Sequence, residues 1–286
     1  MAKDTVFRKK AIINAGGRLM DLSTPQVMGI INLTPDSFFA DSRKPAVTDA
    51  LHQAGQMLAD GATLLDLGAY SSRPGATDIS VQEETDRLLP VVEAIVQTYP
   101  NAILSIDTFR STVAEAAINA GAHIINDIGG GMLDDHMFAT VARLQVPYIL
   151  MHMKGTPQTM VQQAQYTDVF GEVFDYMVER YELLRSMGVH DVILDPGFGF
   201  AKSAEHSYTL MNRLEEFNRL QLPVLVGVSR KRMIYGLLGT TATEALNGTT
   251  VLNTIALTKG ANILRVHDVK EAVEAVKLWS VCKQSD

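Results

Sequence analysis

The segment Val27–Phe39 reads Val-Met-Gly-Ile-Ile-Asn-Leu-Thr-Pro-Asp-Ser-Phe-Phe. Its first five residues form a nearly unbroken apolar run, which is typical of a strand buried on both faces. Its second half is polar, and Pro35 and Asp36 cannot prolong a central strand, because proline lacks the amide that the ladder needs and aspartate favours turns. Asn32 is therefore predicted to lie where a buried strand ends and a loop begins.

The same order of apolar run, polar residue, loop and helix recurs seven more times along the chain. Eight short strands that alternate with helices over this length predict an α/β fold, a single parallel (β/α)₈ TIM barrel. A doubly wound sheet is the alternative, but such a sheet rarely has eight regular units. The predicted strands are residues 27–31, 63–67, 102–106, 123–125, 148–151, 192–194, 224–228 and 262–264.

Residues 11–22 precede the first barrel strand and predict a short hairpin with Asn14-Ala15-Gly16-Gly17 at its turn. This hairpin is expected to plug or cap the barrel. No linker or low-complexity stretch divides the chain, so residues 1–286 are predicted to form one domain with the barrel at about 26–282.

Two helices have distinct sequence signals. Ser80 followed by Glu83 predicts a capping box at the start of a helix over residues 81–98. A second long helix is predicted over residues 166–187, after a polar segment of 14 residues.

The composition excludes several classes of protein. Lysines and arginines number 25 against 32 acidic residues, a net charge of −7 that argues against a general nucleic-acid surface. The single cysteine, Cys282, excludes an internal disulfide and a cysteine metal cluster. The amino-terminal residues lack a signal-peptide core, and no apolar run reaches membrane-spanning length. The sequence therefore predicts a cytoplasmic protein that binds neither nucleic acid nor a membrane.

Each predicted strand ends in a polar or charged residue. In a (β/α)₈ barrel the carboxyl ends of the strands meet at one mouth, where the active sites of such barrels lie. One such residue alone is more often a helix cap or a strand terminator, but a polar group on every strand favours a binding site. The residues at these ends are Asn32, Asp66, Asp107, Asn126, His152, Asp195, Lys231, Arg265 and His267.

Four of these residues suit a flat heterocycle. A carboxylate meets a guanidine-like edge through paired hydrogen bonds, and an amide and an ammonium extend the set to alternating donors and acceptors. The four residues are Asp107, Asn126, Asp195 and Lys231.

Other residues suit a phosphate group or a metal ion. Arg73, Arg265 and His267 are cationic or become so on protonation, which favours phosphate oxygens, although a surface salt bridge is the alternative for each arginine. Asn32 offers an uncharged oxygen for a hard cation such as Mg²⁺, which often bridges to substrate phosphates. The segment 197–203 is similar to a phosphate loop but lacks the adjacent Gly-Lys pair, so it carries little weight.

Taken together, the motifs resemble dihydropteroate synthase. The resemblance covers residues 18 to 280, with the motifs in family order at both strand ends and loops. The matching segments are Gly29-Ile-Ile-Asn-Leu-Thr-Pro-Asp-Ser-Phe38, Ser72-Arg-Pro-Gly-Ala76, Ser105-Ile-Asp-Thr108, Ile125-Asn-Asp127, Leu150-Met-His-Met153, Leu194-Asp-Pro-Gly-Phe-Gly-Phe200, Ser229-Arg-Lys231 and Arg265-Val-His-Asp268.

The resemblance implies that the chain joins 6-hydroxymethyl-7,8-dihydropterin diphosphate to 4-aminobenzoate, releasing diphosphate and giving 7,8-dihydropteroate for folate synthesis. It implies a sulfonamide target and a homodimer formed through late helices. The apolar spacing of Val269, Val273, Val276 and Trp279 is compatible with that dimer and equally with packing on the barrel.

The resemblance also assigns roles to residues. The pterin would be held by Asp107, Asn126, Asp195 and Lys231. The diphosphate would be held by Ser72, Arg73, Arg265 and His267, and Asn32 would hold a Mg²⁺ that bridges to it. The catalytic residues would be Asp107, Asp195, Lys231 and Arg73, and the 4-aminobenzoate pocket would be formed by Thr34, Phe38, Pro74, Lys231 and Arg232. For Asp66, a catalytic role and support of the loop both remain open.

The expected chemistry is a dissociative, SN1-like displacement. Diphosphate leaves readily when a metal ion and cations neutralise its developing charge, and the dihydropterin shares the positive charge left on its methylene carbon. The buried Asp195 would stabilise that charge before the aniline nitrogen attacks. A covalent enzyme intermediate is not expected, because no strand end offers a serine or cysteine paired with a positioned base.

Two residues differ from the common family pattern. Tyr70 stands where many members have an acidic residue, and Arg232 stands where many have a small serine. Arg232 is expected to add only long-range attraction for the carboxylate of 4-aminobenzoate, while backbone amides at the start of a helix receive it.

Two other functions are weighed against this one. A corrinoid methyltransferase acting on methyltetrahydrofolate would share the pterin-holding carboxylates but lack the Ser-Arg-Pro-Gly and Thr-Pro-Asp-Ser-Phe loops, which are present here. A catalytically dead pterin-binding paralogue would be expected to lose Arg73, Lys231 or the Arg-x-His pair, and all are retained.

Overall fold

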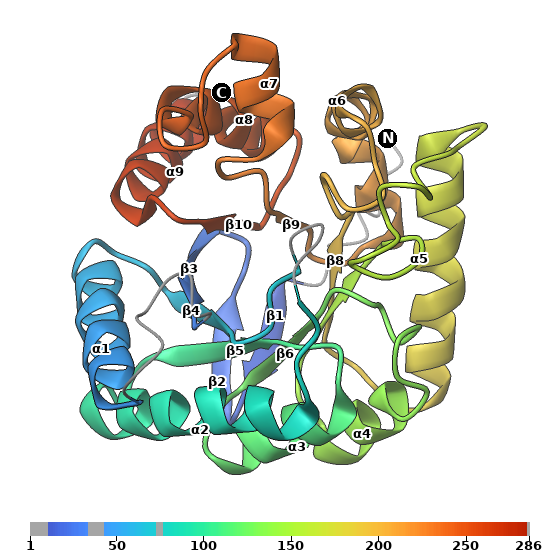
Figure 1. The fold of residues 1–286 in the computed structure, drawn as a ribbon. Coiled ribbons are helices and arrows are strands. Elements are labelled where there is room, and N and C mark those ends of the chain that lie inside the picture. The colour runs from blue at the N-terminus through green and yellow to red at the C-terminus, as the bar shows by residue number, and fades with distance from the viewer. Residues whose placement is uncertain (1–10, 34–42, 73–76, 285–286) are drawn as a thin grey trace, which may run out of the picture.

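The computed structural model describes residues 11–33, 43–72 and 77–284 (Figure 1). Eight parallel strands form one sheet in the order β8-β7-β6-β5-β4-β3-β10-β9, and a parallel bridge between Leu194 and Val224 joins its two ends. The predicted barrel is therefore confirmed, and the doubly wound sheet is excluded. The strands are β3 (Gln26–Asn32), β4 (Leu64–Gly68), β5 (Ile103–Asp107), β6 (Ile124–Asp127), β7 (Tyr148–Met151), β8 (Val192–Asp195), β9 (Leu225–Val226) and β10 (Ile263–Val266).

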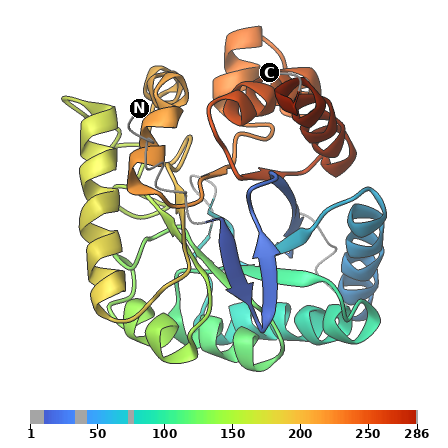
Figure 2. The same ribbon diagram turned by 180° about the vertical axis from the view of Figure 1, so that it is seen from behind.

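The predicted hairpin is present and closes the amino end of the barrel (Figure 2, the blue strands at the centre). Its strands β1 (Ile12–Ala15) and β2 (Arg18–Asp21) pair antiparallel. The hairpin side chains Ile13 and Met20 pack in one buried cluster with apolar residues near the start of the barrel strands, including Leu64 and Ile263. The hairpin is thus a plug over the amino end of the barrel, and its apolar side chains pack on the innermost residues there.

Helices surround the barrel and cover the outward face of its strands (Figure 1). Alternate strand residues such as Leu65 and Leu67 pack outward against these helices in the largest apolar cluster. The helices are α1 (Arg43–Ala59), α2 (Val81–Thr98), α3 (Ser111–Asn119), α4 (Met137–Leu144), α5 (Val169–Ser186), α6 (Ala204–Asn212), the 3₁₀ helix η1 (Leu214–Leu220), α7 (Arg232–Leu238), α8 (Leu246–Thr258) and α9 (Val269–Gln284).

Two helix predictions are corrected. The capping box before α2 is only half formed, because Ser80 Oγ accepts the Glu83 amide at 3.1 Å while the Glu83 carboxylate pairs with Arg87. Helix α5 begins at Val169 and not at 166, because Asp168 caps it by accepting the Phe170 amide at 3.2 Å.

The seventh barrel strand is also shorter than the predicted 224–228. It keeps only Leu225–Val226, because the Val228 carbonyl already accepts the Lys231 amide at 3.1 Å in a turn that leads into α7.

The final helix packs on the barrel through the apolar residues whose role the sequence left open. Val269 and Val276 are buried in the main cluster, and Val273 and Trp279 pack against it. Among the described residues, no helix is long and apolar enough to cross a membrane.

Candidate active site

The alternation of side chains along each strand aims the predicted polar residues into the barrel. In β4, Leu64 lies in the buried inner cluster, Leu65 faces the helices, and Asp66 points inward again. The same step of two residues places Asn126 after Ile124 in β6. Asp195 follows Ile193 and Arg265 follows Ile263 in the same way. Because side chains alternate with period two, one polar layer stacks above the apolar layer that the hairpin closes.

One cluster joins residues from β4, β5, β6 and β10, which we call the Asp66 cluster (Asp66, Asp107, Asn126 and Arg265). Arg265 Nε donates to Asp66 Oδ2 and its Nη2 donates to Asp107 Oδ2, both at 2.6 Å. Asn126 Nδ2 donates to the same Asp66 oxygen at 3.0 Å. The guanidinium therefore bridges two carboxylates, one of which is fully buried.

The charges of the Asp66 cluster are strongly coupled. Burial raises the pKa of Asp107 to about 7, although Arg265 opposes the change. Burial by itself would lower the pKa of Arg265, but the carboxylates of Asp66 and Asp107 outweigh it and raise that pKa above its ordinary value. Arg265 thus remains charged while Asp107 titrates near neutral pH.

Asp195 and Lys231 form a second polar group beside this cluster. Asp195 is buried at the end of β8, and its Oδ1 accepts the Gly197 amide at 2.8 Å. Burial raises its pKa, and the positive charge of Lys231 partly offsets that rise. The Lys231 ammonium donates to the Phe198 carbonyl and lies 4.6 Å from the centre of the Phe200 ring. Burial lowers its pKa to about 8, with Asp195 acting in the opposite direction.

His267 is paired with a serine from the neighbouring strand's loop. Ser229 Oγ lies 3.0 Å from His267 Nδ1 and also accepts the His267 amide at 3.1 Å. The expectation that no strand end offers a serine paired with a base is therefore wrong. The sequence did not predict this pair because the two residues are 38 positions apart in the chain. They meet because β9 and β10 are neighbours in the barrel.

Beside that pair, Arg230 holds the start of α7 in place. Its guanidinium makes two hydrogen bonds to Asp268, at 2.9 and 2.6 Å. Such a bidentate pair fixes geometry as well as charge. It ties the loop that carries Lys231 to the loop that follows β10.

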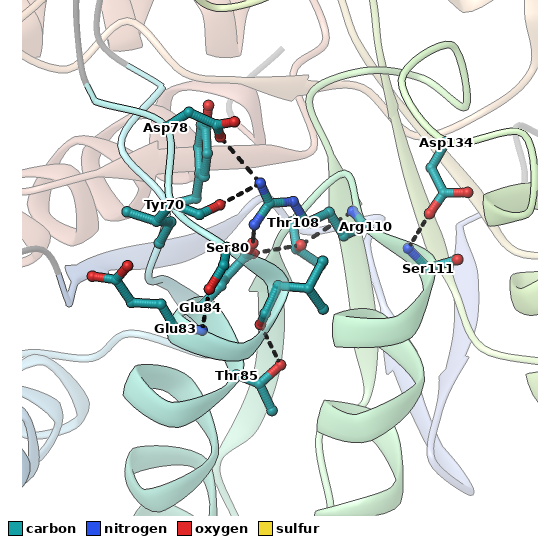
Figure 3. Close-up of polar contacts among 12 residues, drawn as sticks. Tyr70, Asp78, Ser80, Glu83, Glu84, Thr85, Thr108, Arg110, Ser111 and Asp134 are labelled. Carbon is teal, nitrogen blue, oxygen red and sulfur yellow. Dashed lines mark hydrogen bonds and ion pairs between the residues drawn. The ribbon is translucent and has the colours of Figure 1, made fainter.

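A network around Glu84 links the loop before α2 to the loop after β5 (Figure 3). The buried Glu84 accepts from Thr108 Oγ1 at 2.7 Å and from Arg110 Nη1 at 2.8 Å. Arg110 Nη2 also donates to the Ile79 carbonyl at 2.6 Å. Burial raises the pKa of Glu84, and the Thr108 hydroxyl partly offsets the rise. The two loops are thus fastened together within three residues of Asp107.

Tyr70 belongs to the same region and touches a third loop. Its ring packs edge-on against Phe109 with centroids 5.0 Å apart, and its hydroxyl accepts from Gln158 Nε2 at 2.7 Å. An acidic side chain at this position would not offer the apolar ring that Phe109 packs on. In this chain, Tyr70 therefore connects the loops that follow β4, β5 and β7.

The remaining predicted residues divide into two groups. Asn32 is half-buried at the end of β3, and Ser72 is half-buried within the segment that connects β4 to α2. Arg232 is exposed as the first residue of α7. The other four lie outside the described residues, namely Thr34, Phe38, Arg73 and Pro74.

A cavity of about 620 Å³ opens at the opposite, amino end of the barrel. Its lining includes Met20 of the hairpin, Gln26 at the start of β3 and Pro100 before β5. It contains none of the predicted site residues, so the polar chemistry is separate from it.

Comparison with known proteins gives a consistent result. Residues 28–267 match the family described as pterin binding enzyme. Dihydropteroate synthase of Escherichia coli (strain K12) is 44% identical over 266 residues, covering 92% of this chain and 94% of that one. The structure of Yersinia pestis dihydropteroate synthase in complex with a sulfonamide drug superposes with a TM-score of 0.89 at 40% identity, covering 96% of this chain and 99% of that one.

A second solved structure is equally similar. Xanthomonas albilineans dihydropteroate synthase with 4-aminobenzoic acid has a TM-score of 0.88 at 38% identity, covering 96% of this chain and 98% of that one. The resemblance inferred from the motifs is confirmed over nearly the whole chain. The chain belongs to the family of pterin binding enzymes and, within it, to the dihydropteroate synthases.

Proposed function

We propose that the Asp66 cluster, together with Asp195 and Lys231, binds the pterin for the dihydropteroate synthase reaction, in which 6-hydroxymethyl-7,8-dihydropterin diphosphate and 4-aminobenzoate give 7,8-dihydropteroate and diphosphate. One observation carries the proposal. Asp66 Oδ1 and Asn126 Oδ1 are buried, and within the described part of the chain they accept no hydrogen bond. Buried acceptors of this kind are costly unless a donor reaches them, and a pterin offers several N–H groups.

The carboxylates fit the donors of a pterin. Asp107 and Asp195 each commit one oxygen to a protein donor, Arg265 or the Gly197 amide, so the second oxygen of each is proposed to receive the heterocycle. Lys231, whose ammonium contacts the Phe198 carbonyl and the Phe200 ring, is proposed to supply a hydrogen-bond donor to the heterocycle. Sequence alternation and the barrel order bring these groups to one mouth.

The displacement is proposed to be SN1-like. The cationic Arg73 and Arg265 would neutralise the diphosphate as it departs, while Ser72 and His267 bind it. Asp195 would stabilise the positive charge that develops on the pterin methylene. Ser229 is proposed to position His267, because its Oγ accepts the His267 amide and lies beside Nδ1. The pocket for 4-aminobenzoate is proposed to include Thr34, Phe38, Pro74, Lys231 and Arg232.

Mg²⁺ is the proposed cofactor. Mg²⁺ keeps several waters and takes one or two protein oxygens together with substrate phosphates, so a single amide oxygen suits it. Asn32, half-buried at the end of β3 beside Gly68, offers that oxygen at the mouth. When bound there, Mg²⁺ would supply positive charge to the leaving diphosphate.

The direct test is incubation of the chain with the pterin diphosphate, 4-aminobenzoate and Mg²⁺. We expect dihydropteroate and diphosphate to form in equal amounts, and a sulfonamide to compete with 4-aminobenzoate. Consumption of neither substrate by the folded chain would overturn the proposed function.

The rate should depend on pH through two residues. Asp107, with a pKa of about 7, must lose its proton to accept from the pterin, and Lys231, with a pKa of about 8, must keep its proton to donate. We therefore expect kcat/KM for the pterin diphosphate to rise through pH 7 and to fall above pH 8. Asp107→Asn should remove the acid limb, and a phosphorus NMR titration of the substrate controls for its own ionisation. A profile that is flat from pH 6 to 9 would contradict these roles.

Arg232 should matter little and in a salt-dependent way. Its side chain is exposed, where a charge attracts a carboxylate by about 1 kcal/mol or less. Arg232→Ser is expected to raise KM for 4-aminobenzoate a few-fold at low salt, and the difference should shrink as salt is added. A loss of a hundredfold that salt does not change would show that the guanidinium grips the carboxylate directly.

A homodimer is supported by exposed apolar residues on the last helices. Leu237 in α7, Val251 in α8, and Leu278 and Val281 in α9 are all at least half exposed. We expect light scattering to give the mass of a dimer for the wild type. The double variant Leu278→Asp with Val281→Asp is expected to be a monomer that still binds the substrates. The matched control is Leu19→Asp, an exposed leucine on the hairpin at the other end of the barrel, which should stay dimeric. A wild-type monomer at micromolar concentration would exclude the dimer.

A further inference from the structure

Lys202 is a buried lysine that the reaction described above does not use. It lies in the segment between β8 and α6, and only 8% of it is exposed. Its Nζ is 2.9 Å from His152 Nδ1, 3.1 Å from the His152 carbonyl oxygen and 3.0 Å from the Phe200 carbonyl oxygen. An ammonium has three donors and no acceptor, so these three acceptors match it completely.

A buried ammonium needs a reason to be there. Removing a charge from water is costly unless it is fully hydrogen-bonded, and a methionine would fill the same space without that cost. Burial lowers the pKa of Lys202 well below its ordinary value, and the charge of Asp195 partly opposes the change. Burial, followed by the charges of Lys202 and Lys154, lowers the pKa of His152 to about 2, so the ring is a neutral acceptor.

The three bonds join two segments that form the pterin site. His152 follows β7, and its amide donates to the Asp195 carbonyl at 3.1 Å as the last link between β7 and β8. The turn after Asp195 packs directly on this point, because a side chain at Gly197, whose φ is +70°, would lie 2.1 Å from the His152 carbonyl oxygen. Lys202 thus ties this turn to His152 at the end of β7.

The other side of the same turn carries the contacts of Lys231. The Phe198 carbonyl accepts its ammonium, and the Phe200 ring lies beneath it. Lys202 holds the Phe200 carbonyl, so the ring that Lys231 rests on is fixed from the protein interior. A displaced turn would therefore move both Lys231 and the neighbouring Asp195.

We propose that Lys202 is a positioning residue for the pterin site: its ammonium fastens the turn of residues 196–201 to the end of β7 and thereby sets Lys231 against Asp195. This inference rests on the proposed function in assigning the pterin to Lys231 and Asp195. Lys202 itself touches neither substrate.

The charged groups around Lys202 predict a second readout. They are Asp195 from β8, Lys154 from the segment after β7 and Lys231 from the start of α7, with Asp107 and Arg265 acting on Lys231 from β5 and β10. Asp195 raises the pKa of Lys231 against the effect of burial, so a displaced turn that moves Lys231 away from Asp195 lowers that pKa. The alkaline limb of the pH profile should then move to lower pH, which a residue that only stabilises the fold would not cause.

The test compares Lys202→Met with Lys154→Met, steady-state kinetics being measured from pH 6 to 10. Lys154 is the matched control, because it is a nearby lysine whose ammonium bonds to Glu172 and the Gln165 carbonyl, away from the turn. We expect Lys202→Met to lower kcat/KM for the pterin diphosphate by about 30-fold or more, as for a misplacement of about 1 Å, and to move the alkaline limb about half a pH unit or more to lower pH. The KM of Lys202→Met for 4-aminobenzoate should stay within about threefold of the wild-type value. The kcat/KM of Lys154→Met for the pterin diphosphate should also stay within about threefold of the wild-type value.

A milder variant covers the case in which Lys202→Met does not fold. His152→Phe removes only the Nδ1 acceptor, and the ring is already packed edge-on against Tyr176 at 4.8 Å, so a phenyl ring suits the site. It should shift both readouts in the same direction by a smaller amount. Lys202→Met with wild-type kinetics, or His152→Phe with neither shift, would overturn this inference alone. A wild-type chain without synthase activity would instead overturn the proposed function.

Discussion

Replacing Asp195 with alanine is expected to weaken binding of the pterin diphosphate by roughly 30- to 5,000-fold. The loss of one partner from a buried, charge-assisted contact costs about 2–5 kcal/mol, which corresponds to that range. Asp195 is buried at the end of β8 and keeps one carboxylate oxygen for a ligand, since the other accepts the Gly197 amide. Isothermal calorimetry with the pterin diphosphate measures the effect.

The Asp195→Asn variant separates charge from shape. It keeps an oxygen for the Gly197 amide and nearly the same volume but removes the negative charge. We expect intermediate affinity from Asp195→Asn and a thermal unfolding midpoint close to that of the wild type. If Asp195→Ala binds the pterin normally, the pterin lies elsewhere and the assignment of the pocket is wrong.

Replacing Arg265 with leucine should lower the free energy of unfolding by about 3–5 kcal/mol at pH 8. The reason is that Asp66, which is fully buried, and Asp107 would lose the guanidinium that bridges them, and an unpaired buried charge is strongly destabilising. Urea denaturation followed by circular dichroism measures the change. The same variant should also lose affinity for the diphosphate.

This destabilisation should diminish in acid. The pKa of Asp107 in the folded chain, about 7, lies above its ordinary value of 3.8 because of burial. Protonation of Asp107 therefore contributes stability that is fully present below pH 3.8 and is lost as pH rises through 7. Without Arg265 this folded-state pKa moves higher still, so the variant should recover stability between pH 8 and pH 5 more than the wild type does.

A double variant distinguishes pairing from packing. Arg265→Leu combined with Asp66→Asn removes the fully buried charge together with its partner, so the part of the lost stability that unpaired Asp66 causes should return. Binding of the diphosphate should not return, because the cation is still absent. Equal stability of Arg265→Leu and the wild type at pH 8 would show that the bridge between the carboxylates does not hold the barrel together.

The sequence alone determined the barrel and the end of it at which polar side chains gather. Short apolar strands, each followed by a polar residue at its carboxyl end, repeat eight times. Side chains alternate between the two faces of a strand, so Asp66, Asn126, Asp195 and Arg265 face inward once the strands are parallel. These are local properties of each strand, so they can be read from the residues of that strand without knowing which strands lie beside it in the barrel. The hairpin and its closure of the barrel were predictable for the same reason.

The tertiary structure decided which of these polar groups meet. Arg265 bridges Asp66 and Asp107 across 199 and 158 positions, and Glu84 receives Arg110 from 26 positions away. These partners follow from the order in which strands lie around the barrel, which no local pattern expresses. The capping box of α2 was half wrong for a local reason, since Arg87, four residues further along the same helix, pairs with Glu83.

Burial is the other property that only the folded chain provides. Lys202 reads in the sequence as part of a weak phosphate-loop motif, yet it is enclosed by the His152 and Phe200 carbonyls. The pKa of Asp107 near 7 and that of Lys231 near 8 likewise arise mainly from exclusion of water, against the opposite charges of Arg265 and Asp195 respectively. Residue types and spacing specify which charges reach the mouth, whereas desolvation and long-range pairing, which depend on the whole barrel, determine how those charges behave.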